Sequence, residues 1–151
     1  MTDWGAHHFG GATYAVDVRG LQPQEAVLAE DGGKQFVVLK FPNGIEITHG
    51  KPGKGNLAVD FKSGGPVEGR EIPGYKVKGG IYADFTNAVR TREKPFRDIE
   101  YAINTMAVCH LVMLSRQLQR SLRWDAAKQV FPDDPEANRL MDRARREPWQ
   151  L

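Results

Sequence analysis

The chain has 151 residues, of which 40% are hydrophobic and 26% charged. This composition is typical of one soluble globular domain that is long enough to bury a sizeable core. Its 21 basic and 19 acidic side chains leave a net charge of +2, which is too balanced to favour nucleic acid or an anionic membrane as a partner. The one concentrated basic run, residues 139–146, is interrupted by Asp142 and is typical of a solvated helix face.

The sequence gives no sign of a membrane or an export signal. No stretch approaches the ~18 consecutive apolar residues that a membrane span requires. The first residues have neither a basic region nor an apolar region of the kind that forms a signal peptide. A single cysteine, Cys109, excludes an internal disulfide. We therefore expect a cytoplasmic location, although a longer parent protein would be free to carry its own signal.

The first predicted element is a short helix over residues 3–17, weakened by Gly10 and Gly11. It begins with Asp3-Trp4-Gly5-Ala6-His7-His8, in which an aspartate and a histidine four positions apart project from one side of the helix. A nearby carboxylate favours the charged imidazole and holds a histidine ready to take up a proton near neutral pH. The alternative interpretation is a helix start in which Asp3 is only a cap and both histidines are surface residues.

Strands are predicted over residues 25–62. Phe36-Val37-Val38-Leu39 is a short apolar run, Pro42-Asn43-Gly44 indicates a turn, and residues 45–48 and 57–61 alternate between apolar and polar. Residues 63–80 are rich in glycine and proline and predict a loop, with one more short strand at 67–72.

Helices dominate the remainder. A short amphipathic helix is predicted over 82–92, and the strongest helix over 97–121, where an apolar stripe comprises Ile99, Ile103, Met106, His110 and Leu114. Residues 122–131 predict a strand or an extended arm. A last short helix is expected over 135–145, with Asp134 as its N-cap and Pro135 in its first position. Strands and helices that are segregated in this way indicate an α+β fold, with an open, largely antiparallel sheet and helices packed on one face.

Several single residues have ordinary structural interpretations. His110, on the apolar stripe, is predicted to be a hydrogen-bonded core histidine, and Cys109 to be packed and inert. Trp124 and Trp149 are expected to pin the terminal arm to the sheet. Asp3, His7, His8 and His49 are of the types that bind zinc, but adjacent histidines point in different directions and no cysteine pair supports them. A zinc-dependent hydrolase is therefore a minor alternative.

Motifs at both ends resemble one family. Residues 1–8, Met-Thr-Asp-Trp-Gly-Ala-His-His, are similar to the Asp-x-Gly-x-His signature that opens the second domain of Gfo/Idh/MocA oxidoreductases. Cys109-His110-Leu111 and Leu122-Arg123-Trp124-Asp125 resemble the closing helix and arm of a bacterial subgroup. Residues 136–140 and Pro148-Trp149-Gln150-Leu151 resemble its usual C-terminus. Each piece alone is weak, but their order and spacing are specific.

The resemblance implies that residues 1–151 form a single substrate-binding and oligomerisation domain, of the C-terminal type, belonging to an NAD- or NADP-dependent sugar or polyol dehydrogenase. His7 would be the general acid/base that removes the hydroxyl proton, and Asp3 would orient His7 or the substrate. Trp4 and His8 are expected to contact the substrate. A homo-oligomer is expected through the uncovered sheet face. No bound cofactor is expected for this chain alone, because the family's N-terminal Rossmann domain is missing from it.

Two short motifs imitate parts of that missing domain. Residues 53–58 fit the form G-x-G-x-x-A, but the residues directly after them are predicted to form a strand, whereas a pyrophosphate needs a helix N-terminus. Glu93-Lys94-Pro95 matches the family's Glu-Lys-Pro motif by letter, but it lies between two predicted helices. We interpret neither as a cofactor site.

The chain also departs from the family pattern. Gly10 stands where the family often has an acidic residue, and Ala102-Ile103-Asn104 stands where relatives often have Gly-His-Arg. These departures leave substrate and activity open. They also support an alternative, a non-enzymatic sugar-binding or dimerisation module that retained the fold.

Overall fold

The computed structural model describes residues 2–51, 57–61, 79–142 and 146–148. Along these residues the elements are α1 (Thr2–Ala15), β1 (Glu25–Asp31), β2 (Lys34–Lys40), β3 (Ile45–His49), β4 (Leu57–Phe61), α2 (Gly80–Thr91), α3 (Ile99–Leu118), β5 (Leu122–Arg123) and α4 (Pro135–Arg139). The strand that the sequence predicts at 67–72 lies outside the described residues, as does Trp149.

The strands form one antiparallel sheet in the order β4-β3-β2-β1-β5. Gly32 and Gly33 join β1 to β2 with φ angles of 57° and 78°, which is the left-handed conformation that the tightest hairpin turns require at both central positions. The turn predicted at Pro42-Asn43-Gly44 joins β2 to β3, with Gly44 at a φ of 82°.

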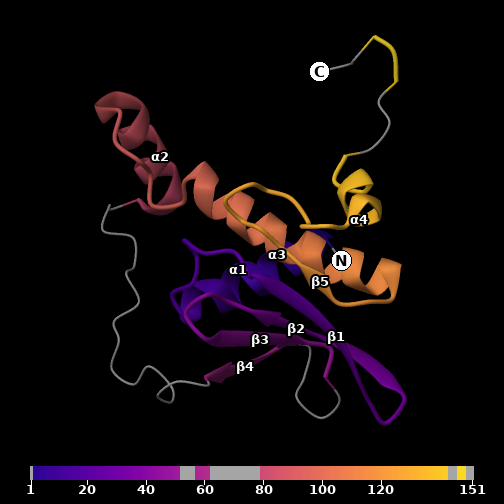
Figure 1. The fold of residues 1–151 in the computed structure, drawn as a ribbon. Coiled ribbons are helices and arrows are strands. Elements are labelled where there is room, and N and C mark those ends of the chain that lie inside the picture. The colour runs from indigo at the N-terminus through magenta and orange to yellow at the C-terminus, as the bar shows by residue number, and fades with distance from the viewer. Residues whose placement is uncertain (1, 52–56, 62–78, 143–145, 149–151) are drawn as a thin grey trace.

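Helices α1 and α3 pack on one face of the sheet, and Figure 1 shows no described helix on the other face. The core lies between these two layers. It contains Phe9 from α1, Val37, Leu39 and Ile47 from the sheet, and Val108 and Val112 from α3, all fully buried. The structure therefore confirms the predicted α+β fold with an open antiparallel sheet and helices on one face.

The predicted orientation of α3 is wrong for most of the stripe, of which Leu114 alone lies in the core at 2% exposed. Ile99 and Ile103 of the expected buried stripe are 71% and 49% exposed, and His110 is exposed instead of lying in the core. The face that packs on the sheet carries Val108, Val112 and the free thiol of Cys109. Burial raises the pKa of that thiol, so the interpretation of Cys109 as packed and inert agrees with the structure.

The segment after α3, residues 119–142, runs back across the molecule and is here named the arm. Its Trp124 is buried and donates a hydrogen bond of 2.8 Å from Nε1 to Oε1 of Gln22, which ties the arm to the segment that precedes β1. Trp124 thus holds the arm, as predicted, but through the segment before β1 and not through a strand of the sheet.

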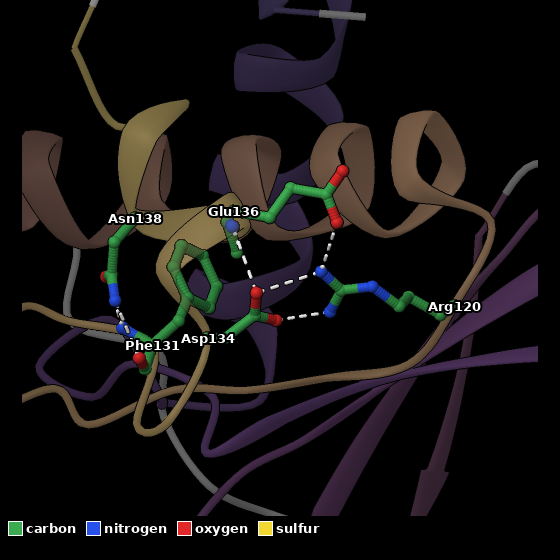
Figure 2. A network of polar contacts seen from close by, with 6 residues as sticks. Arg120, Phe131, Asp134, Glu136 and Asn138 are labelled. Carbon is green, nitrogen blue, oxygen red and sulfur yellow. Dashed lines mark hydrogen bonds and ion pairs between the residues drawn. The ribbon is translucent and has the colours of Figure 1, made fainter.

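The end of the arm is held by the polar network in Figure 2. The Arg120 guanidinium binds both oxygens of Asp134, and also Glu136 at 3.0 Å. As predicted, Asp134 caps α4, accepting from the backbone N–H of Ala137 at 3.0 Å. Helix α4 ends at Arg139, well before the predicted residue 145.

Helix α2 carries large apolar side chains that remain exposed, among them Tyr82 at 84% and Phe85 at 64%. The tripeptide Glu93-Lys94-Pro95 lies in the turn between α2 and α3, as predicted, with the Lys94 ammonium 2.7 Å from a Glu100 carboxylate oxygen. Residues 57 and 58, which complete the G-x-G-x-x-A run, begin strand β4 and not a helix. Among the described residues, no helix is long and apolar enough to cross a membrane.

Candidate functional site

A hollow of about 450 Å³ lies between α1 and the beginning of α3. Helix α1 contributes four residues to its wall and the α3 region six: Ala6, His7, Gly10, Gly11, Arg97, Asp98, Tyr101, Ala102, Thr105 and Met106. Its volume is in the range of small-molecule sites, about 300–1,000 Å³. The histidine that the sequence singles out therefore lies at the edge of a hollow large enough for a small polar ligand.

Close packing at Gly10 sets the width of this hollow. A Cβ atom at Gly10 would lie 3.5 Å from the Tyr101 hydroxyl and 3.6 Å from a Thr105 methyl. The Tyr101 hydroxyl donates a hydrogen bond of 2.7 Å to the Gly10 carbonyl, and the Thr13 hydroxyl donates to the same carbonyl at 3.2 Å. The side chain that is missing at Gly10 leaves the space of the hollow open beside His7.

The α3 wall is polar and already ordered. Asp98 is the N-cap of α3, and its Oδ1 accepts from the backbone N–H of Tyr101 at 2.9 Å. The Arg97 guanidinium lies over the rings of Tyr14 and Tyr101, with its Cζ 5.9 and 5.7 Å from their centroids. These contacts place a cation, a carboxylate and a phenol along one side of the hollow.

Thr105 adds an unsatisfied group to that wall. Its side chain is 7% exposed, and its Oγ1 has no hydrogen-bond partner among the described residues. A buried hydroxyl without a partner costs roughly 1–3 kcal/mol, and because this oxygen is closed off from solvent, a ligand in the hollow does not contact it.

The other predicted site residues lie around this hollow and not in its wall. Trp4 is 73% exposed, and its ring lies 5.9 Å from that of His7 and 6.5 Å from that of His8. His8 is exposed and is not one of the residues that line the hollow. Asp3 lies on α1 one turn before His7, and its side chain is outside the described residues. The structure therefore places His7, itself an exposed residue, at the edge of the hollow and leaves Trp4 and His8 beside it.

His49 belongs to a different environment, on the sheet side of α1. Its ring lies 5.5 Å from that of Phe9, and its Nδ1 is buried without a partner among the described residues. Burial, with smaller contributions from the positive charges of Arg116 and His8, holds the pKa of His49 below its usual 6.5. Within the described part of the chain, no three metal-binding side chains come together, so the geometry offers no support for the zinc alternative.

A second hollow lies on the other flank of α3, between that helix and the arm. This apolar groove has a volume of about 320 Å³ and is lined by Ile99, Ala102, Ile103, Met106, Ala107, His110, Leu111, Leu114, Trp124, Gln129, Phe131, Leu140 and Met141. The stripe that the sequence assigns to the core therefore forms one wall of an open groove.

Sequence reasoning missed the α3 wall of the first hollow. Asp98, Tyr101 and Thr105 follow one another at helical spacing at the start of the long helix, which places them on one side. This polar stripe was a usable signal for the wall. Nothing in the sequence pattern says that it faces α1, because that depends on how the two helices pack.

Taken together, the fold is that of a two-layer α+β domain with a polar hollow beside the middle of its first helix. Residues 29–151 match the model of the C-terminal alpha/beta domain of the Gfo/Idh/MocA oxidoreductase family. The chain therefore belongs to that family, as the resemblance implied. The match begins after α1, so it does not include His7. No curated protein and no solved structure matches the chain significantly.

Proposed function

We propose that this chain is the substrate-binding and oligomerisation domain of an NAD(P)-dependent sugar or polyol dehydrogenase, and that His7 is its general acid/base. The observation that carries the proposal is the position of His7 at a hollow whose opposite wall, on α3, carries the polar residues Arg97, Asp98 and Tyr101. Family membership adds the oxidoreductase class. The site assignment rests on the geometry and on the motif resemblance.

We infer that a dinucleotide is not held by this chain itself. The one glycine run of suitable form leads into strand β4, so a pyrophosphate there would have no helix N-terminus to lie on. We therefore expect a separate Rossmann domain, on the same parent chain or on another, to hold NAD or NADP. The nicotinamide would supply the acceptor for the hydride from the substrate carbon.

The chemistry left to this chain is proton transfer and positioning. When an alcohol is oxidised, its hydroxyl proton must go to a base, and an imidazole suits that task near neutral pH. His7 would accept this proton, and Asp3 would stabilise the imidazolium that forms. Asp98 and Arg97 would bind the other hydroxyl groups of the substrate and hold the reacting one at His7.

A non-enzymatic sugar-binding module is the second candidate, and Gly10 is the observation that favours it. The acidic residue that the family often has at this position would enter the hollow beside Tyr101, and here only a glycine is present. This candidate keeps the same ligand and hollow but predicts no turnover under any condition.

The four histidines give a direct test of the site. His7 lines the polar hollow, His8 and His49 lie outside it, and His110 lines the apolar groove. In a titration with inositols and hexoses followed by imidazole NMR signals, we expect saturable shifts at His7 and little change at His49 and His110. A His7→Asn variant should lose the binding, whereas His8→Asn should bind within a fewfold of the wild type. Shifts confined to any other histidine would contradict the proposed site.

A further inference from the structure

The polar hollow and the apolar groove meet on α3. Both are lined by Ala102 and Met106, so these two residues form a ridge between them. The side chain of Ala102 is a single methyl group, and that of Met106 is flexible and readily changes shape. A ligand that occupies the polar hollow therefore has a low, apolar crossing to the groove beside it.

The floor of the groove is rigid and aromatic. Trp124 and Phe131 are 6% and 2% exposed, and their ring centroids are 4.8 Å apart. Trp124 is fixed through its bond to Gln22. Phe131 is fixed because its backbone N–H and C=O both bond to the Asn138 side chain, at 2.9 and 2.8 Å (Figure 2). A floor held in this way exists before any ligand arrives, which lowers the cost of binding.

The rim of the groove is apolar as well. Ile103, Met141 and Leu140 are 49%, 47% and 39% exposed, and the polar tips that line the groove are those of His110 and Gln129. Apolar surface of this kind gains free energy when a ligand removes it from water. The groove is therefore suited to an uncharged, flat apolar group and not to a second hydroxylated ring.

Resting on the proposed function, we propose that the substrate is a sugar or polyol that carries an apolar, preferably aromatic, substituent. The hydroxylated ring occupies the polar hollow at His7. The substituent crosses the ridge at Ala102 and Met106 and lies in the apolar groove over Trp124 and Phe131. The groove thus determines specificity, and His7 keeps the same role.

Matched pairs of methyl and phenyl glycosides test this assignment. The chain is titrated with the methyl and phenyl β-glucosides, β-galactosides and α-mannosides, and the imidazole signals of His7 and His110 are followed by NMR. The expected result is that a methyl glycoside shifts His7 alone, whereas its phenyl partner shifts His7 and His110 and binds about tenfold more tightly, the gain that partial burial of one aromatic ring provides.

Two matched variants locate the gain. Ile103 in the groove and Val89 on α2 are β-branched helix residues that are 49% and 48% exposed. Ile103→Gln should bring the phenyl glycoside down to the affinity of the methyl one, and Val89→Gln should leave the tenfold difference intact. His7→Asn should weaken both glycosides together, because both place their sugar in the polar hollow.

Three results would overturn the inference about the groove, and a fourth would contradict the proposed function itself. If methyl and phenyl glycosides shift His7 with equal affinity, the groove takes no part and the proposed function stands without it. If phenyl glycosides shift His110 and His7→Asn leaves that binding unchanged, the groove is a separate site. If sedimentation shows self-association of the chain that Ile103→Gln abolishes, the groove is a contact between copies and not a ligand site. If no glycoside or polyol shifts His7, the proposed function itself is contradicted.

Discussion

His49 lies where strand β3 meets helix α1, with the Phe9 ring on one side and the Arg116 guanidinium donating to its backbone carbonyl at 3.4 Å. Its surroundings disfavour the protonated imidazole. Burial is the main cause, followed by the charges of Arg116 and His8, and the pKa of His49 is therefore below 6.5. The fold accommodates His49 best in its neutral form.

This position predicts how stability depends on pH. Because the pKa of His49 is lower in the folded state, the unfolded chain binds more protons in the interval between the folded pKa and 6.5. The contribution of neutral His49 to the free energy of unfolding is complete above the pKa of the unfolded state. It is lost as the pH falls through the lower pKa of the folded state. Thermal unfolding between about pH 7.5 and about pH 5.5 should show the midpoint falling more steeply for the wild type than for His49→Gln. The exposed His110→Gln variant is the control, and identical slopes for the wild type and His49→Gln would refute the assignment.

Gly10 shows at the same scale how a sequence departure acquires a structural meaning. The sequence marks only that an expected acidic residue is missing. The structure adds that the position faces Tyr101 and Thr105 at van der Waals distance, and that its carbonyl accepts the Tyr101 hydroxyl. Neither contact was predictable, because each joins residues about ninety positions apart through the packing of α1 on α3.

Among the elements, α3 has apolar residues on two faces, and only one of them belongs to the core. Leu111 is 2% exposed and packs in the core, whereas Ile99 is 71% exposed. Periodicity identifies the helix but cannot say which apolar face meets the sheet. The predicted stripe lies only partly in the core: Leu114 is 2% exposed, whereas Ile99 and Ile103 are open to the groove.

A pair of truncations tests the orientation of α3. Leu111→Ala removes buried methyl groups and should cost about 2–5 kcal/mol of unfolding free energy. Ile99→Ala removes exposed ones and should change it by about 0.5 kcal/mol or less. Urea unfolding of both variants measures the difference. Equal losses, or a larger loss for Ile99→Ala, would show that the other face of α3 is the buried one.

The remaining elements follow from local chemistry to different degrees. The helix at the start, the β2 and β3 strands with their Asn43-Gly44 turn, and the Asp134 cap were all predictable, because each depends on near neighbours. The end of α4 at Arg139 was not predictable, because the charged residues that follow Arg139 also fit a helical pattern. Of the candidate site, His7 was predicted, but the α3 wall depends on tertiary packing and was missed.

At the scale of the whole molecule, the described helices cover only one face of the sheet (Figure 1). Ala26, Leu39 and Ile47 are fully buried toward the helices, and side chains alternate along each strand. The paired residues Val27, Val38 and Thr48 therefore form a row across the opposite face. Val27 and Val38 are half-buried apolar members of this row, next to the buried Thr48, and apolar surface of this kind is suited to contact with a second copy.

Self-association through this row is a prediction. We expect analytical ultracentrifugation to show a dimer or a larger homo-oligomer, and Val38→Arg to shift it to monomer because a charge would be buried at the contact. Val89→Arg on α2 is the matched control and should leave the assembly unchanged. A monomeric wild type, or an oligomer that Val38→Arg does not affect, would rule out this face.

The central claim is that His7 exchanges the substrate proton while another domain holds the nicotinamide. The most direct test measures reduction of NAD and NADP by sugars and polyols, first with the chain alone and then with the chain joined to a dinucleotide-binding domain of the family. We predict no turnover by the chain alone, turnover by the joined protein, and a loss on the order of 10²–10⁴-fold in its His7→Asn variant. His8→Asn should stay within about twofold, since general acid/base catalysis requires the group that reaches the proton. Turnover that survives His7→Asn would contradict the assignment of His7 as the acid/base.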